Sequence, residues 1–205
     1  MELTCIPKTF RELQRFYGEV FSPLYDRFMT SGAVAQELHA EMAAGLDHLF
    51  CKTSEKTGEI PEEEIRKVAG HLKRATFDSF KLIFEQEIRR TYGKLMGNRY
   101  ADVHDGRFRK EITVKWLEAK GYADAARAME RKSRGAYNDN WHVAFDEWRK
   151  VLPIADYFNG LLTDETVIRA RRASVRQIVI RIILWIATLV AGVFAQTLWS
   201  WVRAN

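Results

Sequence analysis

An uncharged apolar run near the C-terminal end constrains this chain more than any other feature. Residues 182–202 read IILWIATLVAGVFAQTLWSWV, which is 21 residues without a charged side chain. As a helix this run would be about 31 Å long, close to the hydrocarbon thickness of a bilayer. A helix that is apolar on every face must be buried in protein or in lipid, and a domain of about 165 residues rarely encloses one. We therefore expect residues 182–202 to form a transmembrane helix.

The charges around this run predict its orientation. No Asp or Glu follows Glu165, whereas six arginines do. Residues 1–165 hold 26 basic and 27 acidic residues, so the net charge of +5 comes entirely from the C-terminal part. Five arginines precede the run: Arg169, Arg171, Arg172, Arg176 and Arg181. Because positively charged flanks stay in the cytoplasm, we expect a single-pass protein of the inner or plasma membrane with a cytoplasmic N-terminal domain.

Residues at both ends of the chain fit this topology. Trp199 and Trp201 stand at the far end of the run, where indole side chains favour the membrane interface. Arg181 has the length to reach the lipid headgroups on the near side. The first residues, MELTCIPKTF, have neither the basic segment nor the apolar core of a signal peptide. We therefore expect membrane lipid to be one partner and the C-terminal run to be the anchor.

Small residues recur along one side of the predicted span. Ala187, Ala191 and Ala195 are spaced by four, and Gly192 and Gln196 form the adjacent row. Small residues at this spacing let two helices approach closely, and a glutamine can hydrogen-bond between them. This pattern predicts a homo-oligomer formed through the membrane helix. The alternative is that Ala and Gly are simply common in membrane helices and that Gln196 lies at the outer interface.

The remainder of the sequence has helical periodicity nearly throughout. We predict the all-α class: a cytoplasmic helical bundle over residues 1–162, a basic juxtamembrane helix over 163–181, and the transmembrane helix over 182–202. Thr163 is expected to cap the juxtamembrane helix. Gly121 is expected to separate two short helices of the bundle.

One helical segment carries a candidate binding site. Residues 65–85 read IRKVAGHLKRATFDSFKLIFE, and His71, Arg74 and Asp78 follow one another at steps of three and four. Side chains at this spacing share one helix face, which predicts a recognition site for a ligand or a partner protein that the sequence does not identify. The alternative is a structural contact in which Arg74 pairs with Asp78 and holds the bundle in register.

This segment, together with the order of a small helical domain and a C-terminal span, resembles small membrane effectors of bacterial anti-phage systems, such as retron-associated transmembrane proteins. The resemblance implies that the protein damages the bacterial inner membrane on phage infection. It transfers no catalytic motif. Some of those effectors have two spans, whereas this sequence predicts one.

A second resemblance concerns the pair Arg99 and His104. The stretch RYADVH resembles the Arg-x4-6-His motif of HEPN ribonucleases, which implies a catalytic pair at the scissile phosphate. The chain has no P-loop, GxGxxG, GxSxG or HExxH motif and no His/Cys pair at metal-ligand spacing. Acidic residues interleaved with the basic ones argue against nucleic acid as a partner. We therefore expect no enzymatic activity, no cofactor and no metal, with a membrane-tethered ribonuclease or a non-toxic membrane adaptor as alternatives.

Overall fold

The computed structural model of the chain describes residues 7–30, 36–51, 60–97, 106–132 and 141–204; the side chains of Thr30, Ser174, Gln177 and residues 193–204 are not part of this description. Helices account for nearly all of these residues, and no strand occurs among them. The predicted all-α class is therefore confirmed. The pair Arg99 and His104 lies outside the described residues.

The first helical run is continuous, and a tight N-terminal cap starts it. It consists of α1 (Phe10–Phe16), the π-helical turn η1 (Tyr17–Phe21) and α2 (Ser22–Thr30). The Thr9 hydroxyl accepts from the backbone N–H of Glu12, and the Glu12 carboxylate accepts from the backbone N–H of Thr9. This reciprocal pair satisfies two N–H groups that would otherwise lack partners at the helix start. Helix α3 (Gln36–Cys51) follows and packs along α4.

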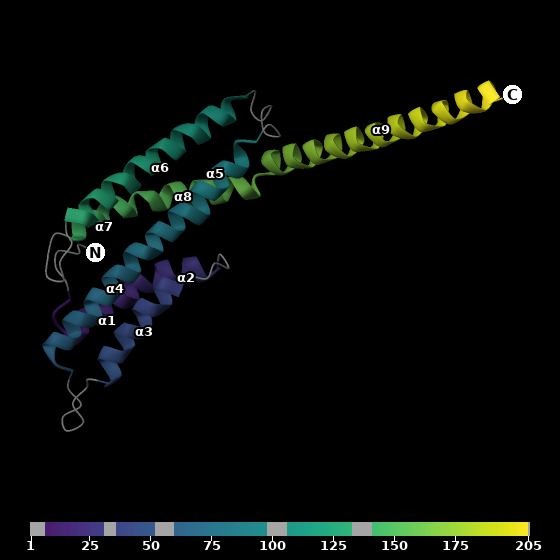
Figure 1. Cartoon of the computed structure of the whole chain (residues 1–205). Coiled ribbons are helices and arrows are strands. Elements are labelled where there is room, and N and C mark those ends of the chain that lie inside the picture. Colours follow the sequence, from purple (N-terminus) through teal and green to yellow (C-terminus); the bar gives the residue numbers. More distant parts are fainter. Residues whose placement is uncertain (1–6, 31–35, 52–59, 98–105, 133–140, 205) are drawn as a thin grey trace.

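A long helical rod forms the centre of the bundle. It consists of α4 (Glu62–Ile83), the π-helical turn η2 (Phe84–Arg89) and α5 (Arg90–Leu95). Glu62, Glu63 and Glu64 occupy its first turn, where the helix dipole favours negative charge. Helices α1 to α3 pack against the first half of the rod, and the following helices pack against its second half (Figure 1).

Three helices pack against the second half of the rod: α6 (Arg107–Lys132), α7 (Trp141–Arg149) and α8 (Val151–Thr163). Phe80 of α4 is stacked on Trp148 with ring centroids 6.1 Å apart and meets the edge of Phe145 at 5.5 Å. The expected break at Gly121 is wrong, because α6 continues through it. Ala119 and Ala123 on either side are fully buried, so packing on both sides of Gly121 outweighs its low helix propensity.

A buried carboxylate joins three of these elements. Glu87 of η2 accepts from Arg27 of α2, with an Nη2–Oε2 distance of 2.5 Å, and from Asn159 of α8, with an Nδ2–Oε2 distance of 2.6 Å. Arg27 also reaches Asp156 of α8 at 2.8 Å. The π-helical turn thus places the Glu87 carboxylate between α2 and α8, where it contacts both helices. The N-terminal helices are therefore tied directly to the helix that leads into the C-terminal segment.

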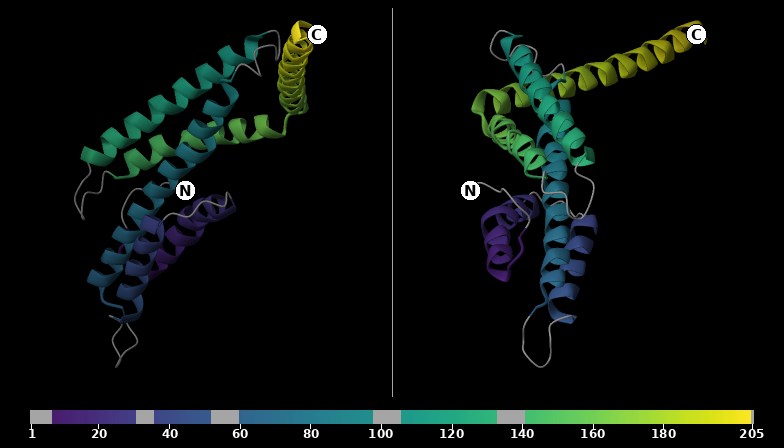
Figure 2. Two further views of the ribbon diagram at one scale, coloured as in Figure 1. Left: turned by 45° about the vertical axis from the view of Figure 1, so that its right-hand side comes forward. Right: turned by 90° about the vertical axis from the view of Figure 1, so that its left-hand side faces the viewer.

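The last helix, α9 (Glu165–Ala204), leaves the bundle as a single rod (Figures 1 and 2). The expected Thr163 cap is wrong. The Asp164 carboxylate accepts from the backbone N–H groups of Thr166 and Val167 at 2.7 and 3.2 Å, whereas the Thr163 hydroxyl donates back to the Gly160 carbonyl. Val167 is buried against the bundle, and the helix beyond Ala170 is exposed throughout its described side chains. The predicted juxtamembrane and transmembrane segments thus form one continuous helix.

Candidate functional site

Helix α9 presents an apolar surface that nothing in the described part of the chain covers. The stretch Glu165–Gly192 is long and apolar enough to cross a membrane, with a mean hydropathy of 1.8 in its most apolar window. None of that window is buried, whereas the apolar helix of a soluble core would be. A long apolar helix that projects from a bundle is what a membrane anchor requires.

Most of the predicted headgroup-binding arginines lie free along the first part of α9. Arg169 is neutralised by Glu165 at an Nη2–Oε2 distance of 3.0 Å. Within the described residues, the other four arginines are exposed and have no acidic partner: Arg171, Arg172, Arg176 and Arg181. Four unpaired guanidinium groups before an apolar segment suit the anionic surface of a membrane. Trp199 and Trp201 belong to α9, but their side chains are not among those that the structure describes.

The predicted self-association row is partly described. Ala187, Ala191 and Gly192 are exposed, and a Cβ added at Gly192 would meet no atom within 4 Å. The Thr188 hydroxyl is satisfied within the helix, because it donates to the Leu184 carbonyl at 2.8 Å. The side chains of Ala195 and Gln196 are not among those that the structure describes. The described part of this row is therefore open to a second helix.

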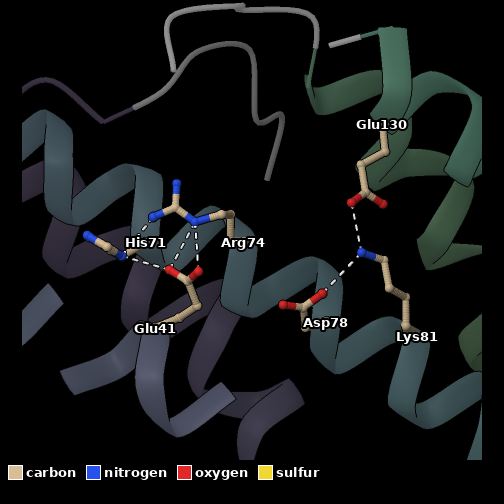
Figure 3. A network of polar contacts seen from close by, with 6 residues as sticks. All are labelled: Glu41, His71, Arg74, Asp78, Lys81 and Glu130. Carbon is tan, nitrogen blue, oxygen red and sulfur yellow. Dashed lines mark hydrogen bonds and ion pairs between the residues drawn. The ribbon is translucent and has the colours of Figure 1, made fainter. Parts of the chain in front are cut away.

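The predicted recognition residues of α4 divide into two polar networks (Figure 3). In the first, Glu41 of α3 lies 2.7 Å from Nδ1 of His71, and both its oxygens accept from Nε of Arg74 at 2.9 Å. Burial alone would raise the pKa of Glu41, but the hydrogen bonds from Arg74 and His71 outweigh it and lower the pKa below its ordinary value. This network therefore fixes α3 to α4 through a charged carboxylate.

Asp78 belongs to the second network. It accepts from Nζ of Lys81 at 3.0 Å, and Lys81 also donates to Glu130 of α6 at 2.7 Å. Burial alone would lower the pKa of Lys81, but Glu130 and Asp78 together raise it. The alternative pair of Arg74 with Asp78 is therefore wrong, because Arg74 pairs with Glu41 of α3 and Asp78 pairs with Lys81 of α4 itself. All three residues of the predicted site are engaged within the bundle.

The structure adds a histidine that the sequence interpretation did not place. His48 of α3 is stacked on His71, with ring centroids 5.3 Å apart, and its Nδ1 lies 2.6 Å from Glu64. A Cβ at Gly45 would lie 3.6 Å from Cβ of His71, so the two helices approach closely here. The signal was present in the sequence, because Glu41 and His48 on one helix, and Glu64 and His71 on the other, are each seven residues apart.

Among the described residues, no group of three or more His, Cys, Asp or Glu side chains could hold a metal ion. Comparison of the chain with protein-family models, with curated proteins and with solved structures gave no match. The features that bear on function are therefore those of the molecule itself: the exposed apolar helix, its arginines and the surfaces of the bundle.

Proposed function

We propose that this protein is a single-pass membrane protein that acts by protein interaction and by self-association in the membrane. The observation that carries the proposal is the exposed apolar surface of α9, which the bundle does not cover. Helix α9 anchors the protein, and the helical domain lies in the cytoplasm because the free arginines precede the span. The predicted binding residues of α4 are engaged in internal contacts, so the bundle binds its partner through another surface.

From the resemblance to anti-phage effectors we further propose that the protein damages the membrane in which it is anchored. Copies that associate through α9 would perturb the bilayer that they share. The row of small residues on α9, which is open over its described part, supports such an association.

Membrane extraction of the full chain tests the anchor. We expect the wild type to remain in the membrane after alkaline carbonate treatment. The variant Ile186→Arg/Leu189→Arg places two cations in the centre of the span, where each costs about 3 kcal/mol, so it should appear in the soluble fraction. The control Ala173→Arg/Val175→Arg changes equally exposed positions before the span, since Val175 and Leu189 are both 49% exposed. Release of the wild type, or retention of both variants, would refute the anchor.

A further inference from the structure

The positive charge of the bundle is concentrated in one segment. Residues 88–110 hold seven basic and two acidic residues, whereas the rest of residues 1–165 holds 19 basic and 25 acidic residues. The count includes residues 98–105, which lie outside the described residues. The bundle is therefore nearly neutral as a whole but strongly polarised in its charge, and such a distribution favours an anionic partner at the basic segment.

This basic segment lies at the end of the bundle where α9 leaves. It comprises the last residues of η2, the whole of α5 and the beginning of α6. Arg109 of α6 donates from Nη2 to the backbone carbonyl of Met96 at 3.0 Å, so the end of α5 and the start of α6 are held together. Helix α5 packs against α8, and α8 leads into α9. Figures 1 and 2 show the end of α5 and the start of α6 beside the first turns of α9.

Four cations of this segment are exposed and have no acidic partner among the residues that the structure describes: Arg90 and Lys94 on α5, and Arg107 and Lys110 on α6. We call these four residues the cationic end. The two acidic residues that flank the segment are engaged elsewhere, Glu87 with Arg27 of α2 and Glu111 with Tyr157 of α8. The cationic end therefore has its charge available to a molecule outside the bundle.

Helix α6 itself does not favour these charges. Arg107, Arg109 and Lys110 stand in its first turn, which holds no acidic residue. The helix dipole favours acidic side chains at this position and disfavours basic ones. Arg109 is explained by its hydrogen bond to Met96, whereas Arg107 and Lys110 form no ion pair within the described residues. We therefore look for their role outside the bundle.

We propose that the cationic end binds the anionic lipid surface of the membrane that α9 enters. The cytoplasmic leaflet carries the opposite charge and attracts clustered Lys and Arg side chains. The cationic end also adjoins the basic first part of α9, so a single membrane surface serves both. The inference rests on the proposed anchoring by α9, which keeps the cationic end close to lipid and raises its effective concentration there.

Docking of the cationic end requires α9 to tilt. Glu165 lies 17 residues before Ile182, about 25 Å along the helix axis, so an upright α9 would hold the bundle above the headgroups. Membrane helices tilt by up to about 40°. A tilt toward the side of α5 and α6 lowers the cationic end further than it lowers α9, because that end lies beside the helix axis. At such a tilt Arg172 is still about 11 Å above Ile182 and outside the headgroup layer.

A dye on α5 tests the docking in the full chain. Gly93 is exposed between Arg90 and Lys94, and a Cβ there would meet no atom within 4 Å, so Gly93→Cys in a Cys5→Ser/Cys51→Ser background takes a label without rearrangement. The protein is reconstituted into vesicles whose headgroups carry an acceptor dye. We expect energy transfer to be at least about twofold higher in a mixture of phosphatidylcholine and phosphatidylglycerol than in phosphatidylcholine alone. About 1 M NaCl, which shortens the Debye length to about 3 Å, should remove the increase.

Charge reversal identifies the side chains responsible. Arg107→Glu/Lys110→Glu should abolish the increase, and the first turn of α6 favours the new charges, so the fold is preserved. Lys120→Glu/Arg131→Glu makes the same change in net charge at exposed positions further along α6 and should retain the increase. A dye on the exposed Cys51, which ends α3, should show no increase, because it lies at the far end of the rod from α9 (Figure 1).

The proposal would be overturned if the wild type showed no increase or if both reversed variants retained it, and the cationic end would then serve another anionic partner, such as an acidic protein or a nucleic acid. Equal loss in both variants would also overturn it, because net charge alone would then explain the attraction. Flotation with phosphatidylcholine vesicles in the same high salt keeps the anchor distinct. All variants should float if α9 spans the bilayer, whether or not the cationic end docks. A chain that does not float would refute the anchor, and the docking with it.

Discussion

Glu41 keeps its charge in a half-buried position because two groups of the neighbouring helix contact it. His71 and Arg74 both lie within hydrogen-bonding distance, and the pKa of Glu41 is lowered as a result. Glu41→Gln removes the charge, and we expect it to lower the free energy of unfolding by about 1 kcal/mol near neutral pH. Urea unfolding of the full chain in detergent, followed by tryptophan fluorescence, measures this change. Glu19→Gln, in an exposed pair with Arg15, should have a smaller effect.

The effect of Glu41→Gln should depend on pH in a defined direction. A carboxylate whose folded-state pKa is lowered stabilises the protein above its unfolded-state pKa, and this contribution is lost as the pH falls through the folded-state value. The ordinary value is 4.5. The difference between wild type and variant should therefore be constant from pH 7 to about pH 5 and shrink below pH 4.5. A difference that grows on acidification would contradict the charged assignment of Glu41.

Arg27 has a larger structural role, because its partner Glu87 is only 8% exposed. Removing the guanidinium in Arg27→Met leaves a buried carboxylate with Asn159 as its remaining polar contact from another helix. Leaving such a charge uncompensated costs about 3 kcal/mol or more, and we expect a loss of this size in the same unfolding measurement. Arg89→Met breaks an exposed pair with Glu85 and should cost less than about 1 kcal/mol. Equal losses would show that Glu87 does not depend on Arg27.

The candidate site could be predicted from the sequence only in part. Helical spacing correctly placed His71, Arg74 and Asp78 on the central helix, because that spacing is a local property. His71 and Arg74 contact Glu41 on α3, which is distant in sequence. Asp78 contacts Lys81 of its own helix, and it is Lys81 that reaches Glu130 on α6. Periodicity within one helix carries no information on such contacts. An apolar groove between α1–η1 and α3, with α4 as its floor, was missed for the same reason, because three separate helices form it.

At the scale of helices, α6 runs through Gly121 although glycine disfavours a helix interior. A Cβ at this position would meet no atom within 4 Å, so an alanine fits without rearrangement. Gly121→Ala should raise the free energy of unfolding by about 0.5–1 kcal/mol, because it restricts the unfolded chain and favours the helix. Thermal unfolding monitored by circular dichroism checks this. A destabilised variant would show that the chain bends at Gly121.

The arginines of α9 should differ in their contact with lipid. With a rise of 1.5 Å per residue, Arg176 lies about 9 Å before Ile182 along the helix axis and Arg172 about 15 Å before it. The headgroup layer is only about 5–8 Å thick. An upright helix therefore places Arg181 in the headgroup layer and Arg176 just beyond it, close enough for its long side chain to reach the headgroups. Each of the two contributes about 1 kcal/mol there, whereas Arg171 and Arg172 stay in water.

Anionic-lipid enrichment around the reconstituted full chain measures this difference. Energy transfer from tryptophan to a labelled anionic lipid should fall about twofold in Arg176→Gln/Arg181→Gln, from the loss of headgroup attraction. It should change little in the matched variant Arg171→Gln/Arg172→Gln. Equal effects of the two variants would instead mean that α9 leaves the membrane at a steep tilt, with its whole basic segment on the surface.

At the scale of the whole molecule, the division into a bundle and a projecting helix was predictable, and the arrangement inside the bundle was not. An uncharged run of 21 residues leaves few physical alternatives to a long apolar helix. Helix boundaries are harder to predict, because the contributions that compete there, such as helix propensity, packing and capping, are similar in size. At Gly121 packing outweighed propensity, and at Thr163 the adjacent Asp164 provided the cap.

The whole molecule also offers a test of what the anchored protein does. If association of the spans perturbs the bilayer, expression of the full chain in bacteria should depolarise the membrane, which a potential-sensitive dye reports. Ala191→Ile adds bulk to the small-residue row and should remove most of this signal. Val190→Ile adds a single methylene at the neighbouring position and should leave it unchanged.

Both variants should remain in the membrane, so their difference separates activity from insertion. Depolarisation that is insensitive to Ala191→Ile would place the activity outside this row of α9. A full chain that inserts, leaves the potential unchanged and is not toxic would instead act as an adaptor, which recruits its partner to the membrane surface. In that case the bundle surfaces, and not the span, would carry the function.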